Sequence, residues 1–156
     1  MQIETAKAAD VPAIVRLWHA GWHQGHGEVV PGALVALRVP AEFEARARER
    51  LGQTHVARGP EGLMGFYMLE GDELYQFYVA KEHQGQGVAG RLMAAAEAAL
   101  AGRMAWLACS VGNDRAAAFY EKAGWTRGPA EVYATQTAQG PVDVTVWRFE
   151  KDLRGT

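Results

Sequence analysis

The chain has 156 residues, of which 49% are hydrophobic and 22% are charged, and its formal net charge is −2. This length predicts a single domain whose core needs neither disulfides nor metals for stability. The slightly acidic balance argues against a broad nucleic-acid-binding surface, so we expect no nucleic-acid partner.

Cys109 is the only cysteine, which excludes an internal disulfide and favours a reducing, cytoplasmic compartment. The N-terminal residues lack the basic and apolar regions of a signal peptide, and no apolar run approaches the length of a transmembrane helix. We therefore expect a cytoplasmic protein without a membrane partner. Cys109 itself is more typical of a small buried side chain than of a nucleophile, because no histidine lies near it in the sequence.

In chain order, the first half predicts a strand at residues 2–5 and then a helix that Asp10 is placed to cap. Apolar residues recur at helical spacing along this helix as far as Trp22. Gly25-His26-Gly27 ends the helix and opens a loop that reaches Gly32. The next predicted elements are a helix at about 41–51 and strands at 54–57, 63–69 and 74–79.

The second half begins with a glycine-rich loop and predicts two further helices and three further strands. These are a helix at about 87–100, a buried strand at 104–110, a helix from Asn113-Asp114 to the C-capping Gly124, and strands near 131–137 and 142–149. The order β-α-α-β-β-β-α-β-α-β-β predicts a single α/β domain with a mixed sheet.

The glycine-rich loop carries the clearest chemical signal in the sequence. It reads Gln84-Gly85-Gln86-Gly87-Val88-Ala89-Gly90 and joins a predicted strand to a predicted helix. Small residues there let the backbone approach a ligand closely, and the free N–H groups of the first helical turn attract an anion. The loop therefore predicts a binding site for a diphosphate.

The loop also allows two other interpretations. Gly85, Gly87 and Gly90 also fit the Gly-x-Gly-x-x-Gly pattern of dinucleotide-binding folds. That pattern is expected after the first strand, whereas this loop follows the fourth, and no second βαβ half completes a nucleotide domain. A purely structural turn is disfavoured because three glycines beside a helix start weaken folding unless close approach is needed.

Two motifs resemble the GCN5-related N-acetyltransferase (GNAT) superfamily. Gln84, Gly87 and Ala89 match its Gln/Arg-x-x-Gly-x-Gly/Ala pattern at a strand-to-helix junction. The segment at 113–125 matches its second motif, an Asn after the next strand and a helix with Ala, Phe-Tyr and a Gly-aromatic end. The resemblance extends over nearly the whole chain and implies a mostly antiparallel sheet of about seven strands flanked by about four helices.

The resemblance implies acetyl-coenzyme A as co-substrate. Its diphosphate would be held by the main chain of the glycine-rich loop. Its pantetheine arm would lie along the fourth strand, with backbone hydrogen bonds like those of an added strand. Asn113 has two open roles, a hydrogen bond to the arm or a helix N-cap. The expected cofactor-binding residues are Tyr78, Val79, Lys81, Gln84, Gly85, Gln86, Gly87, Val88, Ala89, Gly90, Arg91, Asn113 and Tyr120.

Transfer of an acetyl group from a thioester to an amine needs a base, an oxyanion donor and an acid. By resemblance, Tyr120 is the acid that protonates the thiolate and the Val79 N–H is the oxyanion donor, although Tyr120 also suits a packing role. One base position of the family falls on Ala108, which cannot serve. Another falls on Glu73 by spacing, where a solvated carboxylate at the strand end is an equal alternative.

The resemblance implies that the first two helices and their connection shape the acceptor site. His23, His26 and Glu28 of that connection are the candidate substrate-binding residues, and each could instead act as the base. His19 and His23 are four residues apart, a spacing that also suits a metal. No His-Glu-x-x-His pattern is present, so a pocket role is favoured and no metal is expected.

The sequence thus predicts an acetyl-CoA-dependent N-acetyltransferase acting on a small-molecule or protein amine, and the resemblance is compatible with a homodimer. The main alternative is a regulatory or sensor module that binds acyl-CoA without turnover. A protein that binds partners through its sheet edge is a second alternative, for which the sequence holds no specific signal.

Overall fold

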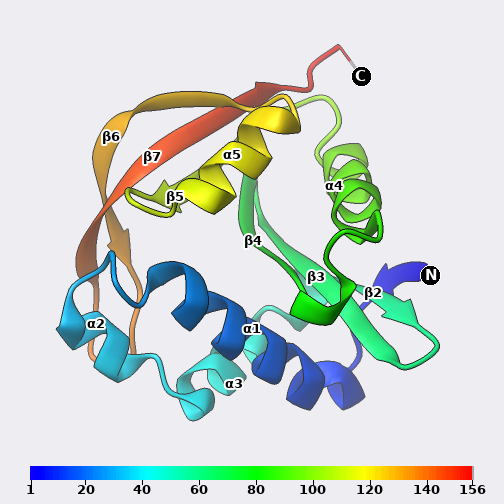
Figure 1. Ribbon diagram of the computed structural model, residues 1–156, viewed down its shortest axis with the longest axis horizontal. Coiled ribbons are helices and arrows are strands. Elements are labelled where there is room, and N and C mark those ends of the chain that lie inside the picture. The colour runs from blue at the N-terminus through cyan, green and yellow to red at the C-terminus, as the bar shows by residue number, and fades with distance from the viewer. Residues whose placement is uncertain (156) are drawn as a thin grey trace.

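The computed structural model describes residues 1–155, in which one sheet of seven strands carries five α-helices on its two faces (Figure 1). The strands are β1 (Gln2–Thr5), β2 (Thr54–Gly59), β3 (Gly62–Glu70), β4 (Glu73–Val79), β5 (Met104–Ser110), β6 (Thr126–Thr135) and β7 (Val142–Asp152). The α-helices are α1 (Val11–His26), α2 (Gly32–Leu37), α3 (Pro40–Glu49), α4 (Val88–Ala99) and α5 (Asp114–Lys122), with 3-10 turns η1 (Ala8–Asp10), η2 (Leu51–Gln53) and η3 (Lys81–His83). The predicted α/β single-sheet fold is confirmed.

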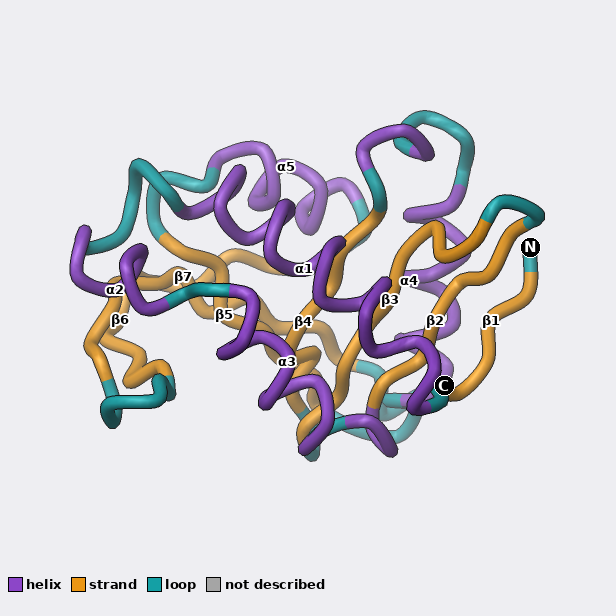
Figure 2. The backbone as a smooth tube through the Cα atoms, turned by 90° about the horizontal axis from the view of Figure 1, so that it is seen from below, coloured by secondary structure: helices purple, strands orange, loops and turns teal. Residues whose placement is uncertain are grey.

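The strands lie in the order β1-β2-β3-β4-β5-β7-β6, which Figure 2 shows from one edge to the other. Every neighbouring pair is antiparallel except β4 and β5. In the described residues, β4 and β5 are in register only at Glu73 and Trp106. Because β4 continues for six residues beyond Glu73 and β5 for four beyond Trp106, the strands separate toward their C-terminal ends. This separation opens the middle of the sheet.

A β-bulge lies in β4 near its start. Met68 of β3 pairs with Gln76, whereas the next residue, Leu69, pairs with Leu74, so Tyr75 is the extra residue of β4. A bulge of this kind bends its strand and redirects a side chain. Here Leu74 packs in the core beneath α4 and α5, while Tyr75 packs with the core beneath α1 and α3.

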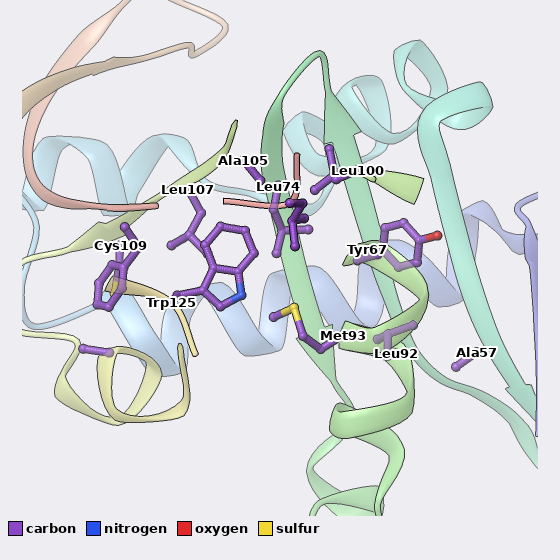
Figure 3. Packing of buried hydrophobic residues seen from close by; sticks show 14 of the residues in the cluster. Ala57, Tyr67, Leu74, Leu92, Met93, Leu100, Ala105, Leu107, Cys109 and Trp125 are labelled. Atoms are coloured by element: carbon purple, nitrogen blue, oxygen red, sulfur yellow. The ribbon is translucent and has the colours of Figure 1, made fainter. Parts of the chain in front are cut away.

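Two hydrophobic cores hold the helices to opposite faces of the sheet. The first joins α4 and α5 to the sheet, and Figure 3 shows Trp125, Leu107 and Met93 gathered in it. The second joins α1 and α3 to the other face around Trp18, which is fully buried and packs edge-on against Phe43 with ring centroids 5.1 Å apart. Burial of large apolar side chains on both faces is what fixes the sheet between the helices.

Three expectations about the elements were wrong in detail. A short helix, α2, follows the predicted loop and was not predicted. The strand expected at 131–137 begins five residues earlier, at Thr126, and ends at Thr135. Asp10 stands at the N-cap position of α1, but its carboxylate accepts hydrogen bonds from the Lys7 N–H and from Arg58 instead of capping the helix.

Candidate functional site

The glycine-rich loop leaves a row of main-chain donors open at the start of α4. Gly85 and Gly87 both have φ of +81°, a conformation that favours glycine, and Gly87 is the N-cap of the helix. The N–H groups of residues 85–90 donate to no backbone carbonyl of residues 1–155. Open donors beside the positive end of a helix dipole suit an anion, so the predicted diphosphate site remains compatible with this geometry.

A cleft of ≈ 650 Å³ begins at this loop and runs between the separated strands. Gly85 and Ala89 line it at one end, and Phe77, Tyr78 and Val79 of β4 line one side. Residues 112–116, which follow β5 and open α5, line the other side. A cleft of this size has room for an extended cofactor arm.

The main chain of β4 presents hydrogen-bonding groups to this cleft. The Ala80 N–H donates to the Met64 carbonyl of β3 at 2.8 Å, which makes Ala80 and Met64 a hydrogen-bonded pair. Because such pairs alternate along an antiparallel ladder, Val79 and Gly65 form a non-bonded pair. The Val79 N–H and carbonyl therefore point away from β3, toward the opening between β4 and β5.

A second, smaller cavity of ≈ 130 Å³ lies on the α1 side of the sheet. Polar side chains line it from several elements: Glu73, His26, Arg38, Arg46, Tyr133 and Thr135. Five residues line both the cleft and this cavity: Phe77, Tyr78, Asn113, Ala116 and Tyr120. The two spaces therefore meet at one place, between β4 and the start of α5.

Tyr120 stands at this meeting point on α5. Its ring packs against Phe119 and Phe149, with centroids 5.5 and 5.7 Å away. The same residue lines both cavities, so a packing role and a role in the site are compatible. Burial is the main cause that raises the pKa of Tyr120 above its usual value. The phenol therefore stays protonated at neutral pH, as a proton donor must.

Glu73 lies at the start of β4 and lines the smaller cavity. It is only 6% exposed, so the alternative of a solvated carboxylate at the strand end is wrong. Burial raises its pKa to about 7, against the opposing effect of a 3.3 Å hydrogen bond that the Tyr133 hydroxyl donates. A carboxylate with a pKa near neutrality is suited to proton transfer at physiological pH.

The three acceptor-site candidates take different positions. His26 lines the smaller cavity. Its ring stacks on Trp22 with centroids 4.8 Å apart, and its Nδ1 donates a hydrogen bond to the Trp22 carbonyl. Burial lowers its pKa to about 4, so it is neutral and its Nε2 carries a free lone pair. His23 instead donates from Nε2 to the Arg38 carbonyl at 2.7 Å, and the exposed Glu28 lines the cleft.

Asn113 serves as a helix cap and also faces both cavities. Its Oδ1 accepts a 3.4 Å hydrogen bond from the Ala116 N–H at the start of α5. Helix α1 approaches it closely, since a Cβ on Gly25 would lie 2.9 Å from the Asn113 Nδ2. A Cβ on Gly21 would likewise lie 2.5 Å from the Tyr78 ring. Two glycines of α1 thus allow the helix to pack against the place where the cavities meet.

The remaining expected cofactor residues are at the cleft or just outside it. Gln84 lines the cleft, and its side chain accepts a hydrogen bond from Arg115. Lys81 and Arg91 are exposed and line neither cavity. Three arginines that were not predicted from the sequence also line the cavities: Arg115, Arg38 and Arg46. In the sequence such an Arg resembles a solvated surface residue, and only tertiary packing brings these three to the cavities.

The His19 and His23 rings lie 4.5 Å apart, close to one another as the metal alternative required. Within residues 1–155, however, no three His, Cys, Asp or Glu side chains are grouped so that they could hold a metal ion. Cys109 is buried, and burial raises the pKa of its thiol to about 12, which suits a packing residue. None of the helices described has both the length and the apolarity needed to cross a bilayer.

Comparison with known proteins places this geometry in a family. The family described as "Acetyltransferase (GNAT) domain" matches residues 50–127, which include β4, the glycine-rich loop and α5. A search of curated protein sequences found no significant match.

Solved structures share the fold over the full length of the chain. A GCN5-related N-acetyltransferase from Rhodopseudomonas palustris is 19% identical with a TM-score of 0.70, over 96% of this chain and 95% of that one. A ribosomal-protein-alanine N-acetyltransferase from Brucella melitensis is 17% identical with a TM-score of 0.68, over 98% and 100%. The PaiA N-acetyltransferase from Thermoplasma acidophilum, solved with coenzyme A, is 15% identical with a TM-score of 0.63, over 96% and 98%. The chain belongs to the GNAT acetyltransferase family.

Proposed function

We propose that the protein transfers the acetyl group of acetyl-CoA directly to the nitrogen of an amine. The observation that carries the proposal is the junction of the two cavities, where Tyr78, Asn113 and Tyr120 line both spaces. The larger cleft suits a long cofactor, and the smaller polar cavity suits a small acceptor. Their junction is therefore where a thioester and an amine would meet.

The cleft would take the cofactor in an extended form. The open N–H groups of residues 85–90 would hold the diphosphate without any need for basic side chains, which agrees with the net charge of −2. The pantetheine arm would follow β4, where the main chain of Val79 faces the cleft. The thioester carbonyl would then accept a hydrogen bond from the Val79 N–H, and this donor would stabilise the oxyanion of the tetrahedral intermediate.

The proton transfers follow from the two titratable residues at the junction and in the cavity. Glu73 in its ionised form would take a proton from the incoming ammonium, directly or through water, and leave a neutral amine to attack the thioester carbonyl. As the carbon–sulfur bond breaks, Tyr120 would donate its hydroxyl proton to the leaving thiolate. No covalent enzyme intermediate is needed, because the amine itself displaces the thiol.

The known structures with this fold support an amine as acceptor. One of them acts on the alanine of a ribosomal protein, and another was solved with coenzyme A. The smaller cavity, of ≈ 130 Å³, favours a small acceptor for the present chain. We also propose that it works in the cytoplasm, in agreement with its single buried cysteine.

Release of free CoA thiol, measured with acetyl-CoA and a broad panel of primary amines, tests the proposal. We expect amine-dependent thiol release together with the matching acetylated amine detected by mass spectrometry. Tight binding of acetyl-CoA with no turnover of any amine would favour a sensor module that binds acyl-CoA.

A further inference from the structure

The wall of the smaller cavity holds a buried guanidinium with an unused donor. Arg38 follows α2 and is only 1% exposed. Its Nη1 donates to Glu42 and to the Gln136 carbonyl, and its Nη2 donates to the Thr135 hydroxyl at 2.9 Å. Its Nε is buried without a hydrogen-bond partner. Unused donors on a buried cation are costly, so a ligand acceptor at this wall would stabilise the arrangement.

A second guanidinium lies beside the first. Arg46 of α3 lines the same cavity, and its Nη2 donates to the Tyr75 hydroxyl at 2.7 Å. Its Nη1 is buried without a hydrogen bond, 3.4 Å from the Glu42 carboxylate. The guanidinium also stacks on the Trp18 ring, with its carbon 4.4 Å from the centroid. Packing thus fixes Arg46, whose Nη1 forms an ion pair with Glu42 but makes no hydrogen bond.

The charges in this cluster do not balance. Arg38 and Arg46 share a single carboxylate, Glu42, whose side chain is 6% exposed. One positive charge therefore remains on the cavity wall. Glu73, the acidic residue that lines the same cavity, has a pKa of about 7 and is only partly ionised at neutral pH. A buried net charge of this kind favours a bound anion.

The unbalanced charge acts at the proposed reaction centre. Burial raises the pKa of Tyr78, which lines the cleft and the cavity, and the positive charges of Arg46 and Arg38 oppose this rise. Burial lowers the pKa of His26, and the charge of Arg38 adds to this lowering. The positive field therefore extends across the space in which the acceptor would lie. A guanidinium pair with unused N–H groups matches the geometry and charge of a carboxylate.

We propose that the acceptor is a small amino acid, an amine that also carries a carboxylate, and that Arg38 and Arg46 bind its carboxylate. This inference rests on the proposed acetyl transfer at the junction of the two cavities. The carboxylate on the cavity wall orients the molecule, so that its amine faces Glu73 and the thioester. A polyamine is repelled by the same wall, and a peptide N-terminus offers only a neutral amide there.

Matched acceptors test this directly. Amino acids of different side chain and of different amine-to-carboxylate spacing are each assayed beside the corresponding amide and the amine that lacks the carboxylate. We expect kcat/KM for the best amino acid to exceed that of its amide by about tenfold or more, the range for a hydrogen bond to a charged group. Amides or plain amines that react as well as their amino acids would overturn the inference.

The variant Arg46→Gln separates charge recognition from a general loss of structure. It is expected to raise KM for the amino acid about tenfold or more while changing KM for the amide little. Arg48→Gln is the matched control, because Arg48 lies on the same helix with a side chain 55% exposed and pairs only with the exposed Glu44 in the described structure. Equal KM values for Arg46→Gln and Arg48→Gln with the amino acid would contradict the proposal.

Failure of the proposed function is distinguishable from failure of this inference. If CoA binds but no compound of the panel is acetylated, the acetyl-transfer proposal loses its support. Calorimetric titration of the same amino acids into CoA-loaded protein then decides the inference alone. Saturable binding that Arg46→Gln weakens would support it, and absence of binding by every amino acid would overturn it.

Discussion

The hydroxyl of Tyr133 on β6 donates a 3.3 Å hydrogen bond to the carboxylate of Glu73 on β4. Two strands, β5 and β7, lie between these strands in the sheet, so the contact brings the far edge of the sheet over the cavity. Both side chains line that cavity. The β6–β7 hairpin therefore helps to set the protonation of the candidate base.

The pH dependence of the rate should report Glu73. Because burial raises its pKa to about 7 and a base must be ionised, kcat/KM should rise with pH through a limb near 7 and level off above it. Glu73→Gln should lose this limb and lower kcat/KM by about 10²- to 10⁴-fold. Glu131→Gln, at an exposed position on β6, is the control and should retain the wild-type profile. A limb that survives in Glu73→Gln would assign it to another group.

Removal of the Tyr133 hydroxyl should move that limb in a defined direction. The hydrogen bond from Tyr133 lowers the Glu73 pKa, so Tyr133→Phe should raise this pKa and shift the limb of kcat/KM to higher pH. The rate at pH values well above the limb should stay close to that of the wild type. A shift to lower pH would show that the contact does not stabilise the ionised carboxylate.

The stability of the fold should depend on the same carboxyl group. Its folded pKa of about 7 lies above its usual value of 4.5, so the folded state holds a proton that the unfolded chain releases. Ionisation therefore opposes folding, and the free energy of unfolding should fall across this window relative to Glu73→Gln. Denaturant unfolding of both proteins at pH 4 and pH 8 measures the difference in unfolding free energy between wild type and Glu73→Gln. Because both proteins contain the same histidines, this difference isolates the contribution of Glu73. An unchanged difference between the two pH values would refute the raised pKa.

Tyr120→Phe should separate binding from turnover. The phenyl ring keeps the packing against Phe119 and Phe149, whereas the proton donor is lost. We expect acetyl-CoA affinity within about twofold of the wild type and kcat lowered by about 10²- to 10⁴-fold. Calorimetry and thiol release, measured on the same preparation, give the two values. An unchanged kcat would remove Tyr120 from the acid role and leave it a packing residue.

The sequence predicted the elements whose signals are local. The buried strand β5 was placed at its observed bounds, since an apolar run between glycines is unambiguous. Helix α2 was missed because it has six residues, begins at a glycine and carries no polar face to reveal a period. The start of β6 was missed because Gly128 and Pro129 read as a turn, whereas pairing with β7 carries the strand through an irregularity there.

The candidate site was predictable where main-chain groups form it, and less so where tertiary packing brings side chains to it. Gly85 and Gly87 were visible because a loop with φ near +81° needs glycine. Arg38 and Arg46 could not be recognised from the sequence. Each lies four positions from Glu42, a spacing that is typical of a solvated ion pair on a helix surface. Only the packing of α3 beneath α1 buries that cluster beside the cavity.

The central claim is that open main-chain donors at the start of α4 hold the cofactor diphosphate. Calorimetric titration of acetyl-CoA into three proteins tests it: the wild type, Gly87→Ala and Gly140→Ala. Both glycines have positive φ, +81° and +97°, and neither has an atom near the site of a new Cβ, so the two variants carry a similar strain of about 1–2 kcal/mol. We predict saturable binding to the wild type with one cofactor per chain, clearly weaker binding to Gly87→Ala, and unchanged binding to Gly140→Ala. No measurable binding of acetyl-CoA to the wild type, or equal affinity in all three proteins, would contradict the account.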